Sequence, residues 1–167
     1  MSAWLRWWKT PFGTAFWSAM LIVFIFWSGR PITFAFDPNE EKCLPDLHVA
    51  MLRHQKPQAP HAGDLVFWKP GGALAYVHQE FALKQVAAVG GDHVTIRGGQ
   101  ILVNGKLVAT GLPLSGVYHR TPAQLERDDV VQPGRMFVIG THPNSDDSRY
   151  WGDLDIKSVD GIAYKVF

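Results

Sequence analysis

The sequence predicts a mainly β domain that follows one apolar helix near the N-terminus. Three observations favour this fold class: a charge-free apolar segment over 12–27, short apolar runs separated by glycine and proline, and an Asn104-Gly105 dipeptide between two such runs. Short strands with frequent turns are typical of barrels and folded sheets. A chain of 167 residues has room for one domain of ordinary size beside the helix.

The apolar segment is long enough to form a membrane anchor over 11–28. Pro11 suits the first position of a helix, and a glycine follows the segment. At about 1.5 Å per residue such a helix extends roughly 27 Å, and tryptophans lie just before it and at its far end. More basic residues precede the segment than follow it. We therefore expect a cytoplasmic tail over 1–10 and an exported domain over 29–167.

Two other uses of this N-terminal region fit less well. A cleaved signal peptide has a shorter apolar region that ends at a pair of small residues, whereas the best site here, Thr33-Phe34-Ala35, is poor. A lipid-modified Cys43 would need small apolar residues before it, but Glu40, Glu41 and Lys42 occupy those positions.

Strand propensity and turn residues then place the elements of the exported part. Asn-Gly between two apolar runs is typical of a two-residue hairpin turn. One segment, 122–128, has a weak helical pattern. Strands are expected at 64–68, 81–89, 93–97, 100–103, 106–109, 135–140 and 161–167.

The composition excludes several classes of function. Sixteen basic and fifteen acidic side chains lack the basic excess of a nucleic-acid-binding protein. Cys43 is the single cysteine, so an intramolecular disulfide and a cysteine-rich zinc site are both impossible. The seven histidines do not have metal-ligand spacing. We expect no metal, no cofactor and no nucleic-acid partner.

Lys84 is the first candidate for chemistry. It lies inside an apolar strand, and alternation puts it on the same face as Ala82 and Val86. Burial favours the neutral form of a lysine, which then acts as a general base near neutral pH. The alternative is an edge lysine whose amine reaches water. The pattern alone favours neither.

The segment 145–152 is the second candidate. It holds two serines, two aspartates and an arginine, and Asp147 and Arg149 are spaced so that they can pair and make the turn rigid. For most of these residues a well-packed turn explains the pattern as well as catalysis does.

These segments together resemble the type I signal peptidase family of Ser/Lys proteases, also called S26. Gly63-Asp64-Leu65-Val66-Phe67 is similar to a strand motif of that family, and 84–92 matches its lysine box in spacing. Residues 145–152, SDDSRYWG, match S-x-D-S-R-x-W-G at every fixed position. The resemblance implies a signal-peptidase-like, β-rich catalytic core at the outer membrane surface, behind one transmembrane helix of the bacterial inner membrane.

The sequence also departs from the family pattern. Cys43 occupies the position of the nucleophilic serine, as Cys43-Leu44-Pro45, which is similar to the S-x-P of the TraF-like branch that matures conjugative pilins. Gln85 and Gly90 replace an arginine and a proline of the lysine box. The loop before Ser145 begins Gly140-Thr141-His142 instead of the usual G-D-N.

The resemblance implies a role for each matching residue. Cys43 would be the nucleophile, with its own backbone N–H in the oxyanion hole. Lys84 would be the general base, and Ser145 would orient that lysine. Asp147 and Arg149 would brace the site, and Pro45 and Asp92 would support it.

The implied activity is cleavage or cyclisation of a conjugative pilin precursor, or of another preprotein, in the periplasm. A Cys/Lys pair would form an acyl-thioester, which amines attack readily, so the same intermediate allows hydrolysis or joining of chain ends. Two alternatives stay open. One is an inactive scaffold that binds pilin or secretion-channel components, and the other is a general signal peptidase. A LexA-like self-cleaving regulator is disfavoured by the anchor.

Overall fold

The structure is a computed structural model that describes residues 10–27, 32–36, 43–71 and 80–166. The chain divides into two compact units, Met1–Ile32 and Thr33–Phe167. Of the segments predicted near the N-terminus, the tail over 1–9 and Ser28 lie outside the described residues.

The first unit contains helix α2 (Pro11–Trp27), which begins at the predicted proline. The Thr10 hydroxyl accepts a hydrogen bond from the Gly13 N–H at 3.1 Å and so caps the first turn. Large apolar side chains of α2 are exposed, among them Phe12, Leu21 and Phe24. In the described part of the chain, no helix combines the length and the hydropathy that a membrane crossing requires.

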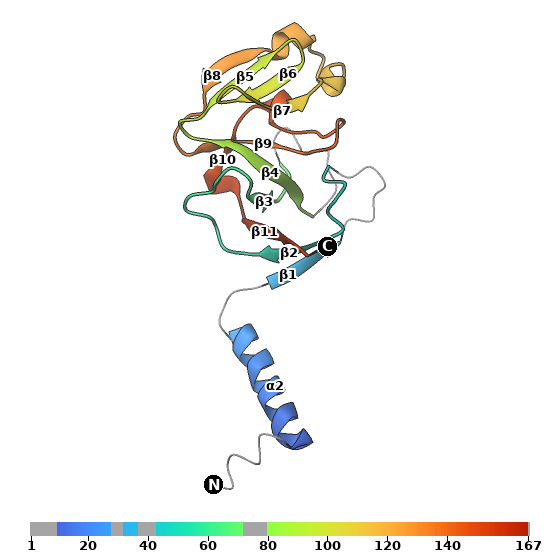
Figure 1. Ribbon diagram of the computed structural model, residues 1–167, viewed down its shortest axis with the longest axis vertical. Helices are drawn as coiled ribbons and strands as arrows, with labels where there is room; N and C mark the ends of the chain where they lie inside the picture. Colours follow the sequence, from blue (N-terminus) through green and yellow to red (C-terminus); the bar gives the residue numbers. More distant parts are fainter. Residues whose placement is uncertain (1–9, 28–31, 37–42, 72–79, 167) are drawn as a thin grey trace. The chain divides into compact units, whose positions relative to one another are not determined.

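The second unit is built from two sheets (Figure 1), which confirms the mainly β fold. The larger sheet has the strand order β1-β2-β11-β3-β4-β9-β10, and the smaller sheet has the order β7-β6-β5-β8. The larger sheet consists of β1 (Ile32–Phe36), β2 (Val49–Arg53), β3 (Leu65–Trp68), β4 (Ala82–Val89), β9 (Arg135–Ile139), β10 (Leu154–Asp155) and β11 (Gly161–Lys165). The smaller sheet consists of β5 (His93–Arg97), β6 (Gln100–Val103), β7 (Lys106–Thr110) and β8 (Arg127–Val130).

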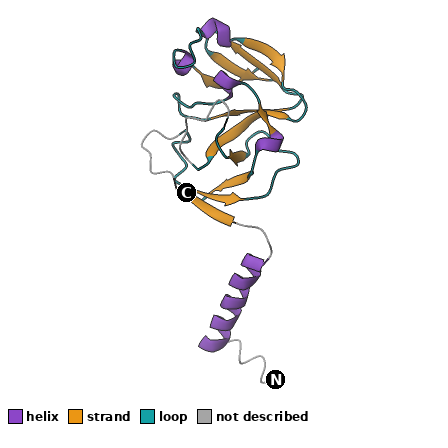
Figure 2. Ribbon diagram, turned by 180° about the vertical axis from the view of Figure 1, so that it is seen from behind, coloured by secondary structure: helices purple, strands orange, loops and turns teal. Residues whose placement is uncertain are grey.

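Among the described residues of the second unit, the helical turns in the connections are all short, as Figure 2 shows from behind. These are η2 (Pro113–Ser115), η3 (Pro122–Leu125), α3 (Ser148–Trp151) and η4 (Ile156–Ser158). The hairpin between β6 and β7 turns at the predicted dipeptide, where Asn104 and Gly105 have φ angles of 49° and 78°. Positive φ at both positions is the requirement of a type I′ turn.

The predicted helix over 122–128 is wrong beyond Leu125. Glu126 has an extended backbone, and the chain continues into β8, where Arg127 pairs with Ile96 of β5. The edge of the smaller sheet offers backbone partners to these residues, and this outweighs a weak local preference for helix.

Strand β4 alternates as the sequence predicts. Ala82, Lys84 and Val86 are buried, whereas Leu83 and Gln85 are partly exposed. Strand β4 pairs with β3 on one side and with β9 on the other, so it is central in the larger sheet. A side chain on its inner face is therefore shielded from water by both neighbours.

Candidate functional site

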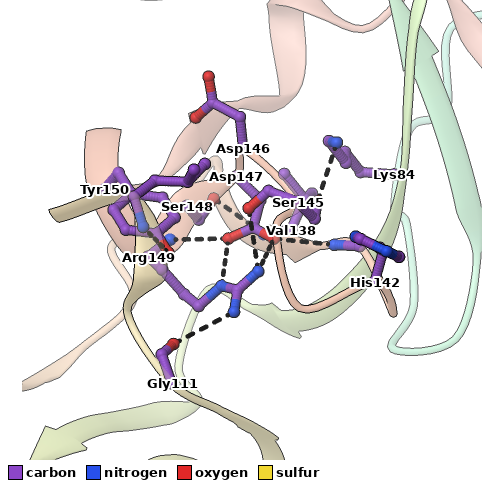
Figure 3. Close-up of polar contacts among 12 residues, drawn as sticks. Lys84, Gly111, Val138, His142, Ser145, Asp146, Asp147, Ser148, Arg149 and Tyr150 are labelled. Atoms are coloured by element: carbon purple, nitrogen blue, oxygen red, sulfur yellow. Dashed lines mark hydrogen bonds and ion pairs between the residues drawn. The ribbon is translucent and has the colours of Figure 1, made fainter. Parts of the chain in front are cut away.

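The amine of Lys84 is buried and bonded to a hydroxyl. The side chain is 4% exposed, and its Nζ donates to the Oγ of Ser145 at 3.0 Å (Figure 3). Within the described residues, this hydroxyl is the hydrogen-bond partner of Nζ, and no carboxylate pairs with the amine. The edge position with an amine in water is thus excluded.

Ser145 is presented by a tight turn that follows β9. Its N–H donates to the His142 carbonyl at 3.0 Å. Gly140 begins the turn, and a Cβ at this position would overlap the Ser145 hydroxyl and lie 2.6 Å from the Cys43 carbonyl oxygen. The close approach of these three segments therefore depends on the absence of a side chain at Gly140.

The predicted pair of Asp147 and Arg149 is present and buried. Arg149 Nε and Nη2 donate to the two carboxylate oxygens of Asp147 at 2.8 and 2.9 Å. Asp147 is 0% exposed and Arg149 is 3% exposed. Burial lowers the pKa of Arg149, but the hydrogen bond and the charge of Asp147 outweigh burial and raise it. The guanidinium thus stays charged and holds the turn as a bidentate clamp.

The Asp147–Arg149 pair is hydrogen-bonded directly to the Ser145 turn. Arg149 Nη2 donates to the Ser145 carbonyl at 3.0 Å, and Asp147 Oδ2 accepts from the Gly140 N–H at 3.0 Å. Figure 3 shows Arg149 between Asp147 and Gly111, whose carbonyl accepts from Nη1 at 3.3 Å. Both ends of the turn are fixed by one ion pair.

Cys43 lies against the same turn. Its carbonyl oxygen accepts from the His142 N–H at 3.1 Å, and the residue is half-buried. Through Gly140 and Ser145 the structure brings the Cys43 backbone close to the Lys84–Ser145 pair. Within the described residues, the thiol itself makes no hydrogen bond. Pro45 is exposed in the turn after Cys43, where the Leu47 N–H donates to the Leu44 carbonyl at 3.0 Å.

Asp92 lies apart from these residues. One carboxylate oxygen accepts from the Val89 N–H at 2.8 Å, and the other accepts from Asn104 Nδ2 at 2.8 Å. It therefore braces the turn between β4 and β5 and the neighbouring hairpin. Asp92 can affect the position of Lys84 only indirectly, through its hydrogen bond to Val89 at the end of β4.

Four residues at the site were not singled out from the sequence: Gly140, His142, Asp146 and Tyr118. His142 Nδ1 accepts from the Asn144 N–H at 3.2 Å, which turns the loop toward Ser145. Asp146 occupies the variable position of the S-x-D-S-R motif, and Tyr118 is distant in the chain. The motif pattern contains no signal for either residue, whereas Gly140 and His142 stand where the sequence departs from the family pattern.

Asp146 has an unusual environment. Burial raises the pKa of its carboxyl to about 6, and the charge of Asp147 adds to this rise. The Tyr118 hydroxyl donates to Asp146 at 2.6 Å. Burial also raises the pKa of Tyr118, so this hydroxyl stays protonated and remains a donor.

The arrangement combines a buried amine, a neutral hydroxyl and a thiol-bearing residue on the adjoining segment. A thiol and an amine are group types that serve in nucleophilic catalysis. Within the described residues, no cluster of His, Cys, Asp and Glu side chains is arranged to hold a metal ion.

The chain matches a family model described as signal peptidase, peptidase S26, over residues 4–167. It is 28% identical over 113 residues to signal peptidase I of Leptolyngbya laminosa, covering 65% of this chain and 53% of that protein. It is 30% identical over 112 residues to probable signal peptidase I-2 of Synechocystis, covering 65% of this chain and 48% of that protein. The chain thus spans about half the length of these curated relatives.

Among solved structures, the chain is similar to a signal peptidase I from Enterococcus faecalis. The identity is 22% and the TM-score is 0.39, with 63% of this chain and 97% of that chain covered.

Proposed function

Because this chain belongs to the signal peptidase, peptidase S26, family, we propose that it is an endopeptidase in which Cys43 is the nucleophile and Lys84 the general base. The observation that carries the proposal is the buried bond between Lys84 and Ser145, next to the backbone of Cys43. A thiol loses its proton more readily than a serine hydroxyl, so the attacking anion forms more easily.

The proposed reaction has two stages. Lys84 Nζ takes the thiol proton while Cys43 Sγ bonds to the scissile carbonyl carbon. The Cys43 N–H stabilises the oxyanion that forms. The C–N bond then breaks, Lys84 returns the proton to the leaving amine, and an acyl-thioester remains on Cys43.

The second stage decides between hydrolysis and joining. Water attack on the thioester, with Lys84 taking its proton, releases a carboxylic acid and regenerates the thiol. Attack by a substrate amine instead forms a new peptide bond. Ser145 would hold Lys84 in place through both stages, with Asp147 and Arg149 bracing Ser145.

We propose a conjugative pilin precursor as the substrate class. Support comes from Cys43-Leu44-Pro45, which is similar to the S-x-P of the TraF-like branch, and from the amine reactivity of a thioester. The substrate would bind as an extended strand. A general signal peptidase and an inactive scaffold that binds pilin or secretion-channel components are the other outcomes of the test.

We further propose that 11–28 anchors the chain in the bacterial inner membrane, with 1–10 in the cytoplasm and 29–167 in the periplasm. Support comes from α2, whose exposed apolar side chains require an apolar surrounding such as lipid. In a Gram-negative host, the chain should resist carbonate extraction. External protease should digest it in spheroplasts, and recovery in the soluble fraction would refute the anchor.

The activity is tested by co-expression with a candidate pilin and intact-mass analysis of the product. Cys43→Ala and Lys84→Ala should leave only precursor, whereas Lys106→Ala, an exposed lysine on β7, should process normally. A wild-type product lighter than the linear mature form by one water means cyclisation. Normal processing by Cys43→Ala would refute the nucleophile, and processing of unrelated preproteins would indicate a general signal peptidase.

A further inference from the structure

A segment from outside the S-x-D-S-R motif is fastened to the Ser145 turn. Residues 111–120, which follow β7, contact the turn and α3 at three polar points. The Gly111 carbonyl accepts from Arg149 at 3.3 Å, the Leu114 N–H donates to Tyr150 Oη at 3.3 Å, and Tyr118 Oη donates to Asp146 Oδ1 at 2.6 Å. This segment, part of the connection from β7 to β8 within the smaller sheet, thus reaches the candidate site.

Tyr118 makes the most specific of these contacts. Its ring is stacked on that of Tyr150, with centroids 5.3 Å apart and planes 9° from parallel. The stacking fixes where the hydroxyl lies, and the acceptor is a carboxylate, so the bond is charge-assisted at neutral pH. A rigid side chain that donates to a charged acceptor determines the position of its partner better than a surface contact does.

Asp146 transmits this restraint to the neighbouring Ser145. Figure 3 shows the Asp146 side chain directed away from the Asp147–Arg149 pair, so it is held from a different direction. The backbone of Ser145 lies between the two attachments: Arg149 holds its carbonyl, and Tyr118 holds the next residue. Loss of either attachment removes one of the restraints that hold the Ser145 hydroxyl beside Lys84.

We propose that Tyr118 is a positioning residue: through Asp146 it holds Ser145 at hydrogen-bond distance from Lys84. The inference rests on the proposed Cys43/Lys84 mechanism, because it assigns a function to the position of Ser145. It adds a residue from the 111–120 segment to the site.

The charges around Asp146 make this restraint sensitive to pH. Tyr118 faces the carboxyl from the 111–120 segment, and Asp147, Arg149 and Tyr150 face it from the turn and α3. Because the pKa of Asp146 is about 6, its carboxylate is protonated in mild acid. The bond from Tyr118 then loses its charge assistance and weakens.

The test compares Tyr118→Phe with Tyr164→Phe in cleavage of a pilin-derived peptide by the full chain. Tyr118→Phe keeps the ring stacking and removes only the donor, and Tyr164 is exposed on β11. Tyr118→Phe should lower kcat about tenfold with little change in KM, as expected for one lost charge-assisted hydrogen bond. Tyr164→Phe should match wild type.

The pH profile separates positioning from general destabilisation. The ratio of wild-type kcat to Tyr118→Phe kcat should be about ten at pH 7.5 and should fall toward one below pH 6, as Asp146 is protonated in the wild type. Asp146→Asn should lack this pH-dependent step. Equal kcat for the two tyrosine variants at pH 7.5, or a ratio that does not change with pH, overturns the proposal.

A failure of the proposed function would give a different result. If wild type cleaves nothing, amide hydrogen exchange of 145–149 decides the positioning role separately. Faster exchange at these amides in Tyr118→Phe than in Tyr164→Phe would retain it, and equal exchange would refute it.

Discussion

Replacing Gly140 by alanine should disable the site while leaving the fold in place. The added Cβ would overlap the Ser145 hydroxyl and lie 2.6 Å from the Cys43 carbonyl, whereas ordinary contact begins at 3.4 Å. The Cys43 carbonyl must therefore retreat by about 0.8 Å, and the Ser145 hydroxyl must also move. A displacement near 1 Å costs roughly 10²-fold in rate when it misplaces catalytic groups.

The cost in stability should be smaller than the cost in activity. Overpacking of this kind costs about 1–3 kcal/mol, which corresponds to a fall in Tm of roughly 3–10 °C for a domain of this size. Both quantities are measurable on one preparation, by peptide cleavage and by thermal unfolding. Gly71→Ala is the matched control, because a Cβ there meets no atom of the described residues within 4 Å.

Two results would refute this reasoning. If Gly140→Ala retains more than half of the wild-type kcat with a stable fold, the close approach of Cys43 and Ser145 does not matter for the reaction. If Gly71→Ala loses as much activity as Gly140→Ala, the loss does not come from crowding at the site.

Two further predictions concern the charged residues of the turn. Asp147→Asn should destabilise the domain by about 3–5 kcal/mol in denaturant unfolding, because it leaves the buried Arg149 charge unpaired; a loss under 1 kcal/mol would show that the pair is dispensable. Asp146→Asn should instead stabilise it at pH 7.5 by on the order of 1 kcal/mol, after allowance for partial screening by solvent. The pKa of Asp146 is raised, so its ionised form is disfavoured in the native state. The gain should shrink toward zero as the pH falls from 6 to 4, and a gain that does not change with pH would contradict this assignment.

Local pattern was sufficient for much of the fold. The Asn104-Gly105 turn and the buried face of β4 follow from rules that act within a few residues, and both are present. Strand β2 was not predicted, since its partner β11 lies more than a hundred residues away in the chain. The first two residues of β8, Arg127 and Asp128, were taken for helix for the same reason: the edge position of this strand beside β5 is a tertiary property.

In the site too, contacts between residues close in sequence could be predicted, whereas contacts between distant residues could not. The Asp147–Arg149 pair is two residues apart and could be inferred from spacing, and the burial of Lys84 is now established. Tyr118 reaches Asp146 across 28 positions of sequence, so only the folded path of the β7–β8 connection reveals it. The requirement for glycine at position 140 also follows only from the fold, because it arises from the close approach of Cys43 and Ser145 at that point.

Of the two attachments of Ser145, only the one through Asp146 responds to mild acid, and this has a consequence for function. The Asp147–Arg149 pair is fully buried, and the pKa of Arg149 is raised, so this brace persists across the physiological range. Asp146 gains a proton near pH 6, which weakens the bond from Tyr118 but removes a disfavoured charge from the native state. Acid therefore reduces the precision of the site while raising this carboxyl's contribution to stability. Activity should be lost at a higher pH than the fold, and the loss should reverse on neutralisation.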